Sequence, residues 1–258
     1  MAPSSALAPW NYGGLPGAYY VSLAATAAAG VIVYRVPDLE VSDQRKAAAA
    51  QVTTRSILRR YWRTFVTLGA GVLLLSAIRQ TRQVVIPLWA AHIGLSPTAS
   101  SVIYGVAGAV DVLTFYPAGK VMDVYGRRWV AVPSAIIMGI AFLFMPLSHG
   151  ATTLAFTAML MGFGNGIGSG IVMTLAADIS PEAGRPTFLG IWRELADAGS
   201  GAGPVILSAV TAISGLASGI VVSGLVGLAA AGALWTWVPE PPGRIGGKAQ
   251  VMARQVSK

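Results

Sequence analysis

Six ionisable side chains lie inside long apolar stretches of the sequence, where a charge can do chemistry and is costly to keep. They are Arg79, Arg82, Asp111, Arg193, Glu194 and Asp197. A charge at the centre of a bilayer costs about 2.5 to 3.5 kcal/mol on insertion scales, so such residues usually face a cavity or a partner. The chemistry open to them is binding of an anionic group, carriage of a proton, or formation of a fixed ion pair.

The apolar run 65–91 carries a polar stripe. At helical spacing, Arg79, Gln80 and Gln83 fall in one sector, with Arg82 farther round the helix. Such a stripe can bind an anionic substrate group or a carboxylate whose protonation changes. The alternative is a fixed ion pair between helices, and the sequence leaves both open.

Asp111 shares a helical face with Gly108 and Phe115, which predicts that its carboxylate points into a helix bundle. An aspartate in that place can carry a proton. If it pairs with Arg79 or Arg82 instead, it stays ionised. The sequence does not choose between these two states.

Arg193 and Asp197 are four residues apart, a spacing that favours an ion pair along one helix face. The six buried charges comprise three positive and three negative groups, which favours a paired network and gives no sign for a substrate.

The composition indicates that the apolar stretches carrying these charges lie in a membrane. Hydrophobic residues make up 54% of the 258 and charged residues only 11%, less than half the share in soluble domains. The apolar runs are too long for barrel strands and do not alternate, so we expect an all-α integral membrane protein with seven spans. The runs are 17–34, 65–91, 98–118, 129–147, 152–177, 186–212 and 216–238.

The spans divide the chain into five segments. We expect an external segment 1–16, a lone transmembrane helix 17–35, a cytoplasmic linker 36–61, a six-helix block 62–238 and a basic cytoplasmic tail 239–258. All basic residues outside the runs fall on one side in this arrangement, so the positive-inside rule places the amino terminus outside and the carboxyl terminus in the cytoplasm. The predicted location is the cell membrane, with multiple passes.

Several other functions find no support in the residues. The basic residues fall between apolar runs rather than on a soluble face, which argues against nucleic acid as a partner. The chain has no cysteine, and neither His92 nor His149 has metal-ligand spacing, so we expect no metal and no cofactor. No catalytic triad or nucleotide motif is present, and we do not expect an enzyme. The glycine-rich stretch GNGIGSG, 164–170, lies inside an apolar run and predicts close helix packing rather than a phosphate site.

Two motifs resemble those of a known family. The stretch GKVMDVYGRR between two spans supplies Gly119, Asp123, Gly126, Arg127 and Arg128. These match the G-x-x-x-D-x-x-G-R-[RK] loop signature of the major facilitator superfamily.

The second motif lies in the fifth helix of the six-helix block. Gly190, Gly199, Gly203 and Pro204 reproduce the G-x8-G-x3-G-P motif found in the fifth helix of a half in that family. One span and a linker precede the block, so the chain resembles the carboxyl-terminal six-helix half plus one preceding helix, with five earlier helices absent.

The resemblance implies a secondary active transporter of small molecules that works by alternating access, with proton-coupled efflux as one form. Its partners would be a small-molecule substrate, protons, the lipid bilayer, and a second six-helix half or a homodimer partner. The cavity residues implied are Arg79, Arg82, Gln83, Asp111, Arg193 and Asp197. The motif around Asp123 would form a cytoplasmic gate, and the glycines with Pro204 would permit bending or close packing. The alternative is a nontransporting membrane protein or partner subunit derived from a split transporter gene.

Overall fold

The computed structural model describes residues 15–35 and 53–239, which form helices and contain no strand. The described part confirms the predicted all-α class. The chain divides into two units, Met1–Ala47 and Ala48–Lys258, and each is described by itself. The predicted external segment, most of the linker and the basic tail lie outside the described residues.

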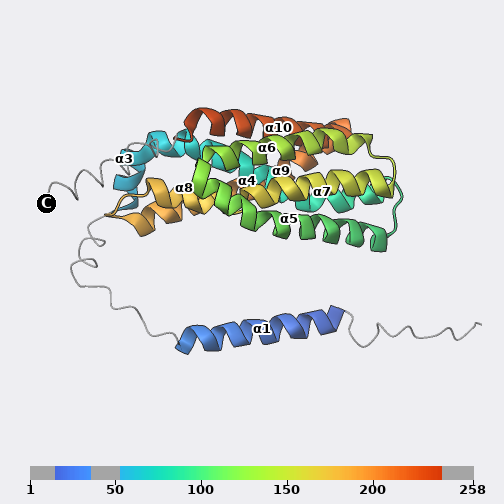
Figure 1. The fold of residues 1–258 in the computed structure, drawn as a ribbon, viewed down its shortest axis with the longest axis horizontal. Coiled ribbons are helices and arrows are strands. Elements are labelled where there is room, and N and C mark those ends of the chain that lie inside the picture. The colour runs from blue at the N-terminus through green and yellow to red at the C-terminus, as the bar shows by residue number, and fades with distance from the viewer. Residues whose placement is uncertain (1–14, 36–52, 240–258) are drawn as a thin grey trace, which may run out of the picture. The chain divides into compact units, whose positions relative to one another are not determined.

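The first unit contributes one described helix, α1 (Leu15–Arg35), which coincides with the predicted lone span 17–35. The second unit contains the remaining described helices, in the range predicted to form the six-helix block (Figure 1). Its elements are α3 (Thr54–Val66), α4 (Leu68–His92), α5 (Pro97–Tyr125), α6 (Arg128–Phe144), the short 3-10 helix η2 (Met145–Leu147), α7 (Ala151–Gly168), α8 (Ile171–Ile179), α9 (Arg185–Ser214) and α10 (Leu216–Trp237).

Within the described residues, five helices are long and apolar enough to cross a bilayer, and the bent pair α3 and α4 adds a sixth if the two helices form one span. In α1 the apolar segment Ser22–Arg35 is shorter than a full span by the same measure. The structure therefore supports five or six spans, and the count of seven stays a prediction.

Two of the predicted apolar runs are broken helices. α3 and α4 bend by 66° at Thr67, so residues 54–61, which we expected in the linker, begin a separate helix. Ser169 and Gly170 separate α7 from α8 inside the predicted run 152–177.

The segment that we expected to form the loop 119–128 is mostly helical, which corrects the sequence prediction. α5 continues through Gly119 and Asp123 to Tyr125, and it ends at Gly126. Gly126 has φ of 103°, a conformation that side-chain-bearing residues rarely adopt. The charged residues did not need a loop, because polar side chains at the end of a long helix can remain exposed.

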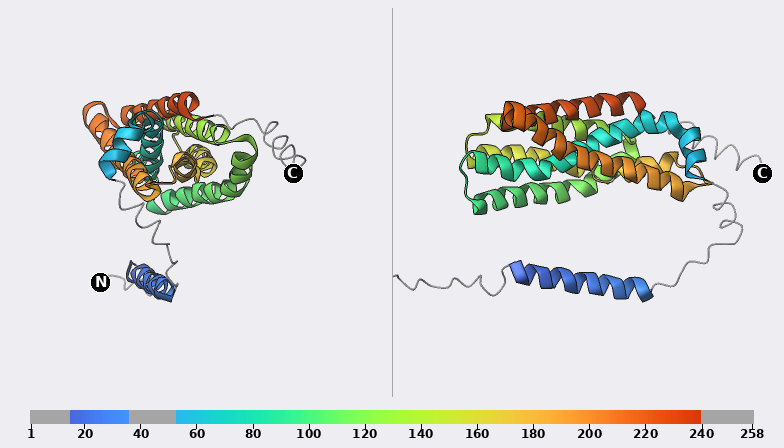
Figure 2. Two further views of the ribbon diagram at one scale, coloured as in Figure 1. Left: turned by 90° about the vertical axis from the view of Figure 1, so that its left-hand side faces the viewer. Right: turned by 180° about the vertical axis from the view of Figure 1, so that it is seen from behind.

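The helices of the block run alongside one another (Figure 2). α7 packs against α5 and α6, α6 against α10, and α10 against α4 and α9, which also pack on each other. Glycines bring several of these backbones together. A Cβ atom on Gly199 would overlap the carbonyl of Leu73, and one on Gly203 would overlap that of Ala77, so α9 lies close against α4.

The predicted packing role of the 164–170 stretch is confirmed. A Cβ on Gly164 would lie 2.8 Å from the Met138 side chain, and one on Gly168 would overlap Ser134. Both neighbours belong to α6. The glycines of α7 thus form a helix interface and not a loop around a phosphate.

Large side chains complete the core where α3 meets α9. Phe65 lies 5.0 Å from Phe188 and 6.5 Å from Trp192 between ring centroids, and Tyr61 meets Phe188 edge-on at 5.4 Å. Phe188 and Trp192 are fully buried. These rings hold the short helix α3 against the end of the bundle.

Candidate functional site

Four polar side chains from three helices meet in the apolar bundle, and we call them the charged cluster: Arg79 and Arg82 on α4, Asp111 on α5, and Asn165 on α7. Arg82 Nη2 donates to Asp111 Oδ2 at 3.0 Å. Asn165 Nδ2 donates to the same oxygen at 2.7 Å. Arg79 donates through Nε to Asn165 Oδ1 at 2.9 Å and through Nη2 to the Asn165 backbone carbonyl at 3.2 Å.

Close helix packing places these side chains together. A Cβ on Gly166 would overlap the backbone carbonyl of Asp111, and one on Gly162 would overlap that of Ala107, so α7 can lie directly against α5 because both positions are glycine. Asn165 precedes Gly166 and thereby reaches Asp111. Arg79 and Arg82 are three residues apart on α4 and can both face α5 and α7.

The charged cluster carries more positive than negative charge. It contains two guanidinium groups and one carboxylate, and the direct partners of Arg79 are both on the neutral Asn165. The side chain of Arg82 is 8% exposed and that of Asp111 is 17% exposed. Arg82 Nε and Nη1 are buried and make no hydrogen bond to any described residue.

The remaining intramembrane charges lie apart from the cluster, on the exposed side of α9. Arg193 Nε donates to Asp197 Oδ2 at 2.9 Å and to Oδ1 at 3.1 Å, which confirms the predicted local ion pair. Glu194 is also exposed. The expected cancellation of three positive and three negative charges therefore does not occur within one network.

The predicted cavity residues fall into two groups. The structure brings Arg79, Arg82 and Asp111 together, with Arg82 as the salt-bridge partner of the carboxylate. Gln83 is exposed and makes no side-chain hydrogen bond to the described residues, and Arg193 and Asp197 pair with each other instead.

A second polar group lies at the junction of α5 and α6, with Arg127 at its centre. Arg127 Nε donates to Asp178 Oδ2 on α8 at 2.8 Å, and Nη1 donates to the Met122 carbonyl at 3.1 Å. The contact with Asp123, at 3.4 Å, is longer. The hydrogen bond to Asp178 is the largest cause that raises the pKa of Arg127 above its usual value, and the charge of Asp123 adds to it.

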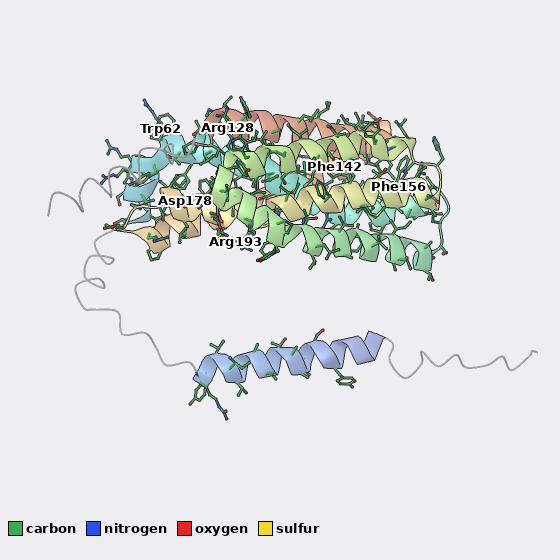
Figure 3. The ribbon with its side chains drawn as sticks, viewed as in Figure 1. Trp62, Arg128, Phe142, Phe156, Asp178 and Arg193 are labelled. Carbon is green, nitrogen blue, oxygen red and sulfur yellow. The ribbon has the colours of Figure 1, made fainter. Side chains whose placement is uncertain are left out.

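The other members of the predicted gate play different parts in the structure. The Arg128 guanidinium lies 3.8 Å from the ring centroid of Trp235 on α10, a cation–π contact. A Cβ on Gly119 would meet no atom within 4 Å. Trp62, Arg128 and Asp178 all lie toward the same end of the bundle, far along it from Phe156 (Figure 3).

The residues of the glycine motif in α9 differ in whether they pack against another helix. Gly199 and Gly203 lie against α4, as the packing role requires, whereas a Cβ on Gly190 would meet nothing within 4 Å. Pro204 lies within α9, which continues from Arg185 to Ser214. Two of the four motif residues thus have a packing function in this block.

Sequence reasoning missed Asn165 and Asp178 as site residues. Asn165 carries the only amide in the stretch GNGIGSG, and a hydrogen-bonding side chain among packing glycines is the signal that could have found it. Asp178 is the only carboxylate in α8 and follows an apolar stretch. Neither position reveals its partner without the helix arrangement.

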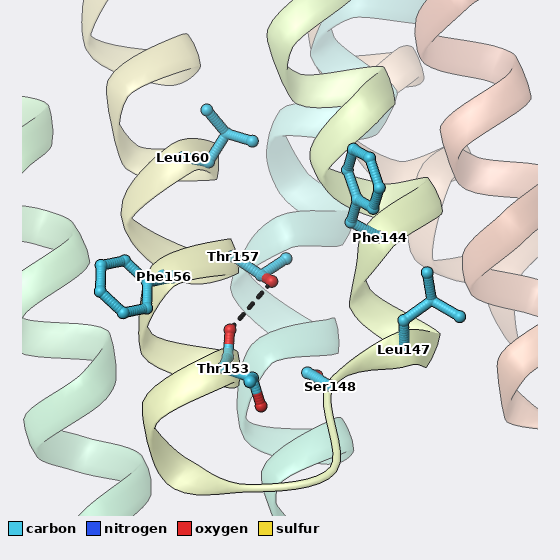
Figure 4. A pocket seen from close by; sticks show the side chains of 7 residues that line it. All are labelled: Phe144, Leu147, Ser148, Thr153, Phe156, Thr157 and Leu160. Carbon is cyan, nitrogen blue, oxygen red and sulfur yellow. Dashed lines mark hydrogen bonds between the residues drawn. The ribbon is translucent and has the colours of Figure 1, made fainter.

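A hollow of about 320 Å³ opens between the end of α6 and the start of α7 (Figure 4). It is lined by Phe144, Leu147, Ser148, Thr153, Phe156, Thr157 and Leu160. Thr157 donates to the Thr153 carbonyl at 3.1 Å, so this hydroxyl is already satisfied. The hollow shares no residue with the charged cluster and has no charged lining residue, and we do not assign the site to it.

Within the described residues, no group of His, Cys, Asp and Glu could hold a metal ion. No curated protein matches the chain in sequence. The model of the Major Facilitator Superfamily matches residues 69–257, a range that begins in α4 and includes all the later helices. This family comprises membrane transporters, and the match covers more than half of the chain, so the chain belongs to the Major Facilitator Superfamily.

Proposed function

We propose that this chain is a polypeptide of a secondary active transporter for small molecules, in which the six-helix block rocks against a second six-helix half around a site at the charged cluster. The second half would come from another segment, another chain or another copy. The observation that carries the proposal is Arg82, a guanidinium 7% exposed in the middle of an apolar helix bundle. A charge is rarely retained at such a position without a functional role.

The charged cluster has the properties of a switch. α4 and α5 make few direct contacts, so the ion pair between Arg82 and Asp111 is a main connection between them. Asp111 Oδ2 accepts two hydrogen bonds, one from α4 and one from α7. We propose that α4 and α5 separate during rocking, that this separation breaks the pair with Arg82, and that Asp111 can take up a proton only in that second arrangement.

We propose proton coupling as the means of driving transport, with efflux as its direction. A proton taken up by Asp111 on one side of the membrane and released on the other would couple the state of the cluster to the position of the helices. Arg79 would remain attached to α7 through Asn165 throughout that exchange, because its partners are neutral.

We assign the gate to the end of the bundle where Arg127 joins α5, α6 and α8. Asp178 is its principal partner and Asp123 is the second. An ion pair between partly exposed groups is weak enough to break and re-form during rocking. We place this end in the cytoplasm, on the basis of the basic residues that the sequence gathers there.

The test uses thiol labelling, because the chain contains no cysteine and a single introduced one is unambiguous. Gln83→Cys lies one residue from Arg82 and is exposed in the block. In vesicles of known orientation, a membrane-impermeant maleimide should label Gln83→Cys from either side, as alternating access requires. The control is Leu154→Cys, which is fully buried and should remain unlabelled.

Labelling of Gln83→Cys from one side only, or from neither side, would overturn the proposal. The vesicles must contain the full chain in its native membrane, so that whatever second half it uses is present.

A further inference from the structure

The first feature that the proposed function leaves unused is the unbalanced charge of the cluster. Arg79 and Arg82 face one carboxylate, and that carboxylate already accepts hydrogen bonds from Arg82 and Asn165 through one oxygen. Two nitrogens of Arg82 are buried without a partner among the described residues. A buried guanidinium nitrogen that lacks an acceptor costs free energy, and an anion supplied to it recovers that cost.

We infer that the charged cluster binds the anionic group of a small molecule, a carboxylate or a comparable oxyanion. The inference rests on the proposed function and adds the substrate class. Arg82 provides the free donors, Arg79 provides the second positive charge, and Asp111 opposes the ligand by its negative charge. Arg79 forms no ion pair with a carboxylate of the described residues, and its hydrogen bonds go to Asn165.

Loss of the Asp111 charge should strengthen anion binding, and a purely structural ion pair would not have this effect. Removal of its charge by Asp111→Asn leaves two guanidinium groups without an internal counter-ion. An anion should then bind more tightly, by about tenfold, because a like charge near the ligand has been removed. A structural pair would only be destabilised by the same change.

The test uses sodium benzoate as the probe and sodium chloride as the matched salt. The midpoint of thermal unfolding is measured for the full chain in detergent as each salt is titrated. Benzoate should raise the midpoint saturably for the unaltered chain, and about tenfold less benzoate should suffice for Asp111→Asn. The control Arg193→Gln removes an exposed guanidinium outside the cluster and should bind benzoate as the unaltered chain does.

Benzoate should not raise the unfolding midpoint of Arg82→Gln. If Arg82→Gln does not fold, Arg82→Lys, which keeps the positive charge, replaces it in the same measurement. The inference is overturned if benzoate and chloride act alike on the unaltered chain and on Asp111→Asn, or if Asp111→Asn binds benzoate more weakly. Benzoate binding without two-sided labelling of Gln83→Cys would retain the anion site and overturn alternating access. Two-sided labelling without benzoate binding would overturn the anion site and retain alternating access.

An independent feature is the surface of α3. Its sequence, TRSILRRYWRTFV, contains four arginines and no acidic residue. Ile57 and Phe65 are buried, while Leu58, Trp62 and Val66 are exposed. The backbone leaves helical conformation at Tyr61, so Leu58 precedes this kink and Trp62 and Val66 follow it. The exposed part of α3 combines these apolar side chains with Arg55, Arg59, Arg60 and Arg63.

The bend between α3 and α4 determines how α3 is oriented relative to the membrane plane. α3 and α4 meet the length and hydropathy requirements of a membrane span only together, and α3 departs from the axis of α4 by 66°. If α4 crosses the bilayer, α3 lies closer to the membrane plane than to its normal. A tryptophan at the surface of such a helix suits the headgroup region, and arginines beside it suit lipid phosphates.

We propose that α3 is an in-plane interfacial helix that binds anionic phospholipid headgroups of the membrane the protein occupies. Anionic headgroups complement the charge of α3, which has four positive side chains and no negative one. Each arginine near an anionic surface contributes a free energy that corresponds to about fivefold in affinity.

The test is native mass spectrometry of the full chain in detergent, with phosphatidylglycerol and phosphatidylcholine as the two lipid probes. Phosphatidylglycerol should bind in preference, and Arg59→Gln should weaken it by about fivefold without changing phosphatidylcholine binding. Arg193→Gln, an exposed arginine on α9, is the matched control. Equal binding of the two lipids, or equal losses in Arg59→Gln and Arg193→Gln, would overturn the proposal.

Discussion

Two ion pairs of the same residue types lie in different surroundings in this bundle. Arg82 and Asp111 join α4 to α5 and are 8% and 17% exposed, whereas Arg193 and Asp197 lie on one helix and are 64% and 51% exposed. Both pairs are close to 3 Å long. We therefore expect burial and the number of helices joined, rather than the distance, to determine how much each pair contributes to stability.

The largest effect is expected at the buried pair. Arg82→Gln removes the guanidinium and leaves the Asp111 carboxylate with Asn165 as its only hydrogen-bond partner among the described residues. We expect the free energy of unfolding to fall by about 3 to 5 kcal/mol, the usual result of breaking a buried pair. Denaturant unfolding in micelles measures it, and a loss as small as that of an exposed pair would contradict the assignment.

The next effect sharpens the comparison by testing what brings the helices together. Gly203→Ala places a Cβ against the Ala77 carbonyl and the Thr81 hydroxyl, so we expect a loss of about 1 to 3 kcal/mol from overpacking. Gly190→Ala on the same helix meets no atom within 4 Å and is the matched control. If the two variants unfold alike, the packing role of the motif is wrong.

A smaller effect is expected at the partly exposed pairs around Arg127. Asp178→Asn should reduce stability by less than about 1 kcal/mol, and Asp123→Asn by less again, because the Asp123 contact is longer and its side chain is 73% exposed. Thermal unfolding of the two variants side by side gives the order. A larger loss from Asp123→Asn would show that the loop motif, and not Asp178, provides the main partner.

The smallest effect is expected at the local pair on α9. Arg193→Gln should change the free energy of unfolding by about 0.3 to 0.5 kcal/mol, the usual value for helix pairs four residues apart. Added salt should reduce even this difference. A loss of several kcal/mol would mean that Arg193 is buried in the assembled protein.

The sequence predicted the helical class and the local pair on α9, because these depend on long apolar runs and on spacing within one helix, whereas the division into a lone span and a six-helix block stays a prediction. It identified Arg79, Arg82 and Asp111 as unusual for the same reason. It could not choose which arginine pairs with Asp111, because that depends on the rotation of α4 against α5. Asn165 escaped notice because its role exists only where Gly166 lets α7 approach α5.

The junction between α5 and α6 shows what the sequence could not predict about helix ends. A run of charges after an apolar stretch suggested a turn, yet only Gly126 departs from helical conformation before α6 begins. The hydropathy pattern locates the membrane boundary, and the helix end is set by backbone conformation. The partner of Arg127 on α8 is 51 residues away in sequence and could not be read from spacing.

The most direct test is a pair of double-mutant cycles measured by unfolding in micelles, one for Arg82 with Asp111 and one for Arg193 with Asp197. Each cycle uses the Gln and Asn replacements singly and together. Our account predicts an interaction free energy of about 2 to 3 kcal/mol for the buried pair and no more than about 0.5 kcal/mol for the exposed pair. Equal interaction free energies in the two cycles would contradict the claim that the charged cluster is a distinct site.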